Sequence, residues 1–168
     1  MKILAGIQIP RKFAFSRMTM LSRLRYAGIT KDDLLTIYKL FIRSTVEYCS
    51  VAFHSALTQE QTRKIELIQK TSLKIILGSE YDSYESALSS CSLDTLFKRR
   101  GDRMLKFSIK CTQDKFNKKI FPYNTNTKNK EHFIVNFART NKYLKSAVPQ
   151  CQRLLNATAK GNPDLFLT

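Results

Sequence analysis

Four cationic side chains recur at helical spacing in the second half of the chain. They are Arg99, Arg103, Lys106 and Lys110. Intervals of four, three and four residues place them along one face of a helix. Such a row suits phosphate groups, because nucleic-acid backbones are dense polyanions. A row of this kind is also typical of an ordinary solvated helix face, and the sequence leaves both interpretations open.

A second set of cations lies near the N-terminus. We predict phosphate contacts for Arg11, Lys12, Arg17 and Arg25 as well. Within a helix, Arg17 and Arg25 fall about two turns apart on one side. The alternative is again a solvated basic surface.

The distribution of charge supports a polyanionic partner. Residues 1–31 carry seven Lys or Arg and no acidic residue, residues 32–94 have a net charge of −3, and residues 95–168 have a net charge of +12. A slightly acidic middle between basic flanks indicates a packed core that carries cationic surfaces. Nucleic acid is the commonest partner of such surfaces.

One pair of carboxylates resembles a catalytic metal site. Two-metal phosphoryl transfer needs carboxylates that converge from separate elements on ions about 4 Å apart. Asp32 and Asp33 instead follow Thr30 and precede a helical pattern. We therefore predict that they stabilise the first turn of a helix, where negative charge is favourable.

Other residues that catalyse reactions or bind metals lack the necessary spacing. The two histidines and four cysteines do not have the spacing of metal ligands: His54, His132, Cys49, Cys91, Cys111 and Cys151. We expect the four cysteines to be reduced. No phosphate-binding glycine loop or nucleophile elbow occurs. We predict no catalytic residue, no metal and no cofactor in this chain.

The apolar pattern is helical over most of the sequence. We predict helices at about residues 11–27, 31–56, 59–77, 94–114 and 150–159. Gly28 and Gly78 should end two of them, Thr30 and Thr58 should cap two, and Ser92 or Asp94 should begin the fourth. The segment 31–56 is apolar around most of its circumference, so we expect a central helix in which Tyr38, Tyr48 and Phe53 belong to the core.

The composition changes after residue 121. Residues 123–130 are rich in Asn, Thr and Lys, residues 132–138 partly alternate, and we expect residues 141–148 to be extended. The predicted fold class is mainly α, a helical bundle with a small irregular or β-hairpin C-terminal part. The expected domains are residues 1–120 and 121–168. No apolar run is long enough to cross a membrane, and we expect an intracellular protein in the nucleus or cytoplasm.

Several runs together resemble a known family. They are LLTIYKLFIRSTVEYC at 34–49, Leu57-Thr58 with Gln61, IELIQK at 65–70, LFKRR at 96–100, YLKSAVP at 143–149 and LLN at 154–156. This pattern is similar to the region just after the catalytic palm in reverse transcriptases of non-LTR (LINE-type, jockey-like) retrotransposons. Phe53 stands where the family usually has Trp, which is a tolerable exchange in a core.

The resemblance implies a thumb and connection that hold the template–primer by its backbone. The partner would be an RNA–DNA hybrid or duplex DNA, bound without sequence preference, and a polymerase palm domain is a second possible partner. The palm motifs that bind magnesium in full-length relatives have no counterpart here, so this chain alone is not expected to be an RNA-directed DNA polymerase. The expectation is a truncated C-terminal fragment. A protein-docking helical module and a non-functional retroelement remnant remain alternatives; no membrane or small-molecule substrate is expected.

Overall fold

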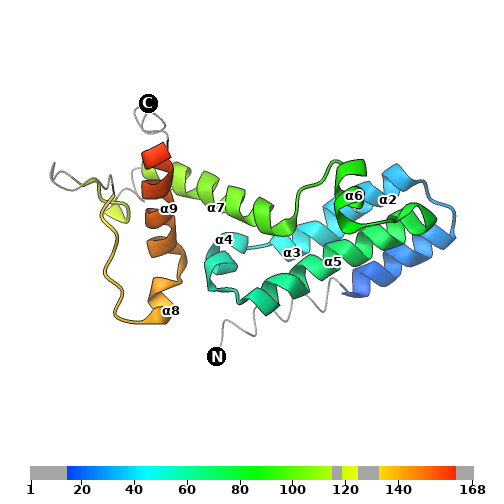
Figure 1. Cartoon of the computed structure of the whole chain (residues 1–168), viewed down its shortest axis with the longest axis horizontal. Helices are drawn as coiled ribbons and strands as arrows, with labels where there is room; N and C mark the ends of the chain where they lie inside the picture. The colour runs from blue at the N-terminus through cyan, green and yellow to red at the C-terminus, as the bar shows by residue number, and fades with distance from the viewer. Residues whose placement is uncertain (1–14, 115–118, 125–132, 162–168) are drawn as a thin grey trace. The chain divides into compact units, whose positions relative to one another are not determined.

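The computed structural model describes residues 15–114, 119–124 and 133–161 (Figure 1). Within these ranges the chain is mainly helical, which confirms the predicted fold class. It divides into two compact units. Unit 1 contains the residues up to Cys49 and Thr58–Arg99, and unit 2 contains Ser50–Leu57 and the residues from Arg100 onward. The expected boundary after residue 120 therefore falls inside unit 2.

Unit 1 is built from short and long helices. They are a helix at residues 15–26, α2 (Lys31–Ile37), a π-helix (Tyr38–Arg43), α3 (Ser44–Glu47), α5 (Gln59–Leu77), a 3₁₀ turn (Gly78–Glu80), α6 (Tyr84–Ser90) and the first turn of α7 (Leu96–Gln113). The helix α2 packs against α5. Residues spaced by four along the α2–α3 segment face this contact and are buried: Leu34, Tyr38, Ile42 and Val46.

Local signals in the sequence set several of these helix ends. Thr58 and Gln61 form the predicted capping box: Gln61 N–H donates to Thr58 Oγ1 at 3.2 Å, and Thr58 N–H donates to Gln61 Oε1 at 2.9 Å. Thr30 likewise accepts from the N–H of Asp33 and begins α2. Gly28 ends the first helix with a φ of +82°, a conformation that glycine adopts at little cost.

The single helix predicted for residues 31–56 is wrong. After α3 the chain is extended at Tyr48 and then turns through Cys49, whose φ is +52°. Residues beyond this turn form α4 (Ser50–Phe53) and a 3₁₀ turn (His54–Ala56) in unit 2. The apolar circumference had suggested one central helix, but the segment is divided between two units, and Leu40, Phe41 and Tyr48 are exposed.

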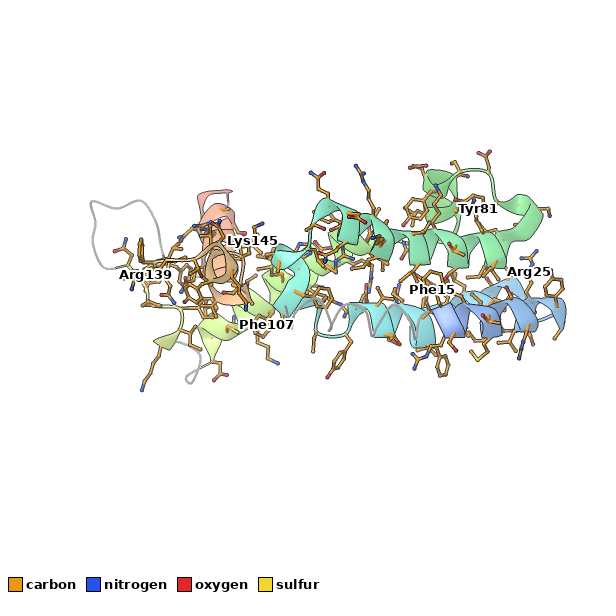
Figure 2. All side chains as sticks on the ribbon, turned by 90° about the horizontal axis from the view of Figure 1, so that it is seen from below. Phe15, Arg25, Tyr81, Phe107, Arg139 and Lys145 are labelled. Atoms are coloured by element: carbon orange, nitrogen blue, oxygen red, sulfur yellow. The ribbon has the colours of Figure 1, made fainter. Side chains whose placement is uncertain are left out.

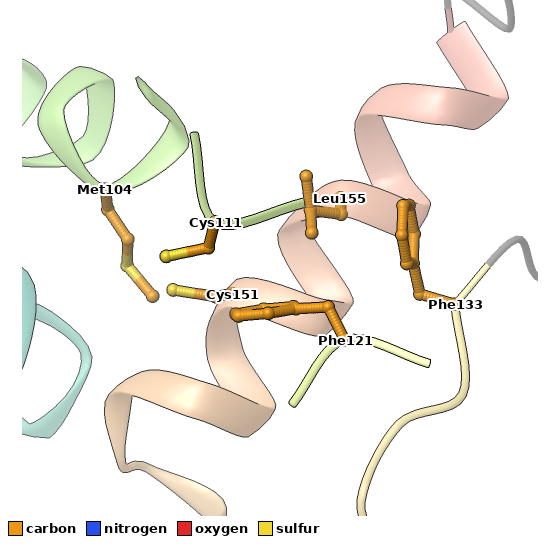
Figure 3. Packing of buried hydrophobic residues seen from close by; sticks show 6 residues of the cluster. All are labelled: Met104, Cys111, Phe121, Phe133, Cys151 and Leu155. Atoms are coloured by element: carbon orange, nitrogen blue, oxygen red, sulfur yellow. The ribbon is translucent and has the colours of Figure 1, made fainter. Parts of the chain in front are cut away.

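Unit 2 contains the remainder of α7, together with α4, α8 (Asn141–Leu144) and α9 (Ala147–Gly161). Its core is a cluster of buried apolar side chains from α7, α9 and the segments between them: Met104, Cys111, Phe121, Phe133, Cys151 and Leu155 (Figure 3). Figure 3 shows the side chains of Cys111 and Cys151 pointing the same way, toward Met104. All four cysteines of the chain are free thiols.

The C-terminal part is more helical than predicted. Residues 141–144 form α8 instead of an extended segment, because Thr140 caps them by accepting from the N–H of Tyr143. The helix α9 begins at Ala147, three residues before the predicted start. In the part of the chain that the structure describes, β pairing is limited to one antiparallel bridge between Tyr123 and Phe133. No described helix is long and apolar enough to span a membrane.

Candidate nucleic-acid interface

The exposed face of α7 in unit 2 carries three of the predicted phosphate-contacting residues. Arg103, Lys106 and Lys110 are exposed, whereas Met104 and Ser108 on the opposite face are buried. The helix rises by about 1.5 Å per residue, so the three cations span about 10 Å. Duplex DNA carries one negative charge per ~1.7 Å of axis when both strands are counted, so a duplex of this length carries about six phosphates. Among the described residues, Lys106 and Lys110 form no ion pair.

Arg99 differs from Lys106 and Lys110 because its charge forms an ion pair within unit 1. Its Nε donates to Glu47 Oε1 at 2.6 Å, and its Nη2 donates to Glu47 Oε2 at 3.2 Å. The Glu47 side chain is 1% exposed and that of Arg99 is 27% exposed. The hydrogen bonds to this carboxylate raise the pKa of Arg99 further above its usual value. The guanidinium is therefore aimed into unit 1 and joins α3 to α7.

The N-terminal cations that the structure describes are also used inside unit 1. Arg17 donates to the backbone carbonyl of Phe41 and to the hydroxyl of Thr45. Arg25 (Figure 2) donates to the carbonyl of Ile75 at 2.7 Å and to that of Ile76, near the end of α5. Cations are favourable at the negative C-terminal end of a helix dipole. These contacts give both arginines a role in packing.

Arg11 and Lys12 lie outside the described residues. The predicted set of eight cations thus separates into three exposed residues of unit 2, three residues engaged within unit 1, and two whose placement is not described. The helical spacing predicted that Arg103, Lys106 and Lys110 share one exposed face of α7. It could not distinguish Arg99, because its partner lies 52 residues earlier in the chain.

A carboxylate from α5 orients the start of α7. Glu66 accepts from the N–H of Leu96 at 3.0 Å and from the N–H of Phe97 at 3.3 Å. The hydroxyl of Thr95 accepts from the N–H of Lys98 at 3.2 Å, so Thr95 is the local cap in place of the predicted Ser92 or Asp94. Thr95 directly precedes the first helical residue, which is the position where a cap can reach these donors.

A fully buried amide connects the residues just before α7 to the core of unit 1. Gln69 accepts from the hydroxyl of Tyr38 at 2.6 Å and donates to the carbonyl of Asp94 at 2.9 Å and to the hydroxyl of Tyr84 at 3.1 Å. Buried polar groups are stable only when they are paired. Burial, chiefly, raises the pKa of Tyr38 well above its usual range and keeps the phenol neutral. Gln69 therefore has a structural role in the core of unit 1.

Two amides of α9 perform the same task in unit 2, and the sequence patterns did not identify them. Asn156 accepts from the N–H of Phe133 at 2.8 Å and donates to the carbonyl of the same residue at 2.9 Å. Gln152 accepts from the N–H of Asn136 and donates to the carbonyl of Ile120, both at 2.8 Å. Gln152 is completely buried and Asn156 nearly so. Together they fix the irregular segments 119–124 and 133–136 to α9.

The remaining candidates show how apolar and titratable residues are placed. Asp32 and Asp33 lie in the first turn of α2, as predicted. Tyr38 is fully buried, whereas Tyr48 is 72% exposed and its assignment to the core is wrong, because the chain leaves the helix there. Burial and then the nearby Arg100 charge lower the pKa of His54. Among the described residues, no cluster of His, Cys, Asp and Glu could hold a metal ion.

No family model matches the chain, and neither a curated protein nor a solved structure matches it.

Proposed function

We propose that this chain is a post-palm, thumb-like segment of a non-LTR retrotransposon reverse transcriptase and that it binds nucleic acid by its backbone without sequence preference. The resemblance of residues 34–156 to that family supports the assignment. The observation that carries the binding proposal is the exposed face of α7, with Lys106 and Lys110 one turn apart. The chain has no polymerase centre of its own in this proposal. An RNA–DNA hybrid or duplex DNA is the ligand.

The charge of unit 2 is consistent with this function. The residues of this unit include fourteen Lys or Arg and four Asp or Glu. Such an excess attracts a polyanion over distances of about one Debye length, roughly 8 Å at physiological salt. Phosphate contacts fix the position of a protein on a duplex but carry no sequence information. Binding should therefore depend strongly on salt and weakly on sequence.

The test is the salt dependence of binding in charge-matched variants. Fluorescence anisotropy measures the affinity for an RNA–DNA hybrid and for duplex DNA across a salt series. Each lost phosphate contact lowers the slope of log affinity against log salt by about 0.9. The double variant Lys106→Ala/Lys110→Ala should lower the slope by about 1.8.

The matched control removes the same charge from a different helix. Lys70 and Lys74 are exposed, four residues apart and located on α5 in unit 1. The variant Lys70→Ala/Lys74→Ala should leave the slope close to that of the wild type. If both double variants lower the slope equally, the α7 face is not the binding site. If neither double variant changes the salt slope or the affinity, Lys106 and Lys110 make no phosphate contacts.

Exposed apolar side chains in unit 1 favour a second candidate, a protein-docking module. Leu40 is 63% exposed, Phe41 is 49% exposed and Tyr48 is 72% exposed. Exposed apolar groups of this size are typical of interaction surfaces when they are contiguous. This function predicts self-association that Leu40→Lys weakens, measured by sedimentation velocity. It also predicts a small salt slope in the binding series above.

A further inference from the structure

Two aromatic rings are exposed on a cationic segment of unit 2 that the proposed function does not use. Phe137 is 85% exposed and Tyr143 is 40% exposed. Three exposed cations lie among and beside them in the sequence: Arg139, Lys142 and Lys145. Figure 2 labels Arg139 and Lys145. The chain has no acidic residue between Phe133 and Lys160, so no carboxylate of this stretch neutralises the cations.

The backbone that carries Phe137 is held in place by α9. Asn156 pairs with both the N–H and the carbonyl of Phe133, and Gln152 accepts from the N–H of Asn136. The residue directly before Phe137 is therefore fixed by a buried side chain. A group that is already ordered loses little conformational freedom on binding, which leaves more of the contact energy available.

Tyr143 is tied to the same point. The amide of Asn136 donates to the Tyr143 hydroxyl at 3.3 Å. Thr140 caps α8 by accepting from the N–H of Tyr143 at 3.2 Å. Asn136 thus ties the Tyr143 hydroxyl to the backbone position directly before Phe137, although the two aromatic residues lie six residues apart in the sequence.

The ligand must satisfy both the rings and the cations. Full burial of a Phe side chain is worth about 1.5–3 kcal/mol, and this chain leaves that gain unused at Phe137. Single-stranded nucleic acid offers flat base faces for the rings and phosphates for the cations. A duplex offers phosphates only, because its base faces are stacked within the helix. Exposed rings beside cations therefore favour the single strand.

We propose that Phe137 and Tyr143, with the neighbouring Arg139, Lys142 and Lys145, form a stacking surface for single-stranded nucleic acid. The inference rests on the proposed function insofar as both concern nucleic acid. The inference goes beyond the proposed function because it names a second surface and assigns an unpaired strand to that surface as the ligand. The residues are different from those of the α7 face, so each proposal can fail without the other.

The chain contains no tryptophan, which makes a specific probe available. The variant Phe137→Trp places the only indole of the protein at the proposed stacking position. Titration with a 20-nucleotide oligothymidylate or oligouridylate should quench its fluorescence, because stacked bases quench indoles. A duplex of equal length should quench it much less. Tyr26→Trp is the control, since Tyr26 is 93% exposed but lies in unit 1.

Affinity gives an independent readout. Phe137→Ala should bind the single strand about 5- to 150-fold more weakly, the range expected for one stacked base. Its salt slope should be unchanged because the ring carries no charge. The ring is largely exposed, so the variant should fold normally, and circular dichroism checks this. Tyr26→Ala should bind as the wild type does.

Three results separate the proposals. The stacking surface is refuted if oligonucleotides do not quench the fluorescence of Phe137→Trp and Phe137→Ala binds the single strand as tightly as the wild type does. This conclusion does not depend on whether the α7 lysines bind duplex. If the single strand quenches the indole while Lys106→Ala/Lys110→Ala has no effect on duplex binding, the stacking surface stands and the α7 proposal fails. If phosphatidylserine vesicles or an acidic peptide alter the indole and oligonucleotides do not, the surface serves another class of anion and this inference is refuted.

Discussion

The ion pair between Arg99 and Glu47 gives the sharpest test of how the cations of α7 divide between folding and binding. Arg99→Ala removes the two hydrogen bonds that the guanidinium donates to a carboxylate whose side chain is 1% exposed. Breaking a buried pair from one side costs about 3–5 kcal/mol. Arg99 itself is 27% exposed, so water can partly replace it. We therefore expect unit 1 to lose about 2–4 kcal/mol of stability.

The assay is urea unfolding followed by circular dichroism, at low salt and in 1 M salt. A buried pair is poorly screened, so the loss should be similar at both salt concentrations. Lys98→Ala is the control, because Lys98 pairs with Asp94, just before α7, but both side chains are exposed. That variant should lose at most about 0.5 kcal/mol. The double variant Glu47→Leu/Arg99→Met should recover much of the loss, because neither member of this pair is left charged without its partner.

Binding measurements complete this test. Folded Arg99→Ala should keep the wild-type salt slope for duplex DNA, because its guanidinium already serves Glu47. A fall of about 0.9 in the slope would show that Arg99 contacts a phosphate in the wild type. A stability within about 0.5 kcal/mol of the wild type would refute the role assigned to the ion pair.

Three further predictions concern buried polar groups. Gln69→Leu should cost about 2–4 kcal/mol in urea unfolding, because it leaves the hydroxyl of the buried Tyr38 and the part-buried carbonyl of Asp94 without this partner. A loss below about 1 kcal/mol would contradict this. Asn156→Leu should speed hydrogen exchange at the amide of Phe133, and unchanged exchange would show that the side chain does not protect it. Burial and Arg100 lower the pKa of His54, so its contribution to stability is present above the unfolded value of about 6.5 and lost as pH falls. Urea midpoints should therefore fall less on acidification in His54→Gln than in the wild type.

Local signals predicted the helix ends that depend on neighbouring residues. The capping box of Thr58 and Gln61 spans three residues, and Gly28 needs only its own backbone freedom. The break at Tyr48–Cys49 had no such signal, because no Gly or Pro occurs between residues 29 and 77. A non-glycine residue in the left-handed region costs about 1–2 kcal/mol, which packing of the following residues in unit 2 must offset.

The residues that position the candidate site were harder to predict than its cations. The carboxylate of Glu66 reaches the N–H of Leu96 over 30 residues, and the amide of Asn156 reaches Phe133 over 23. A glutamate on a helix is usually a solvated residue, so its type gave no reason to expect a structural role. Such partners are determined by the tertiary fold and have no fixed spacing in sequence. The exposed row of Lys106 and Lys110, in contrast, follows from helical geometry alone.

The short segment Ser50–Leu57 interrupts unit 1 and belongs to unit 2. A ribosome making this chain would release the segment well before α9, which begins at Ala147. At about 5–20 residues per second, the delay is roughly 5–20 s. Unit 1 could close as soon as Arg99 has emerged, with Ser50–Leu57 held as a loop that still lacks its partners. The order of synthesis therefore favours early completion of unit 1, and no single cut in the chain can release either unit intact.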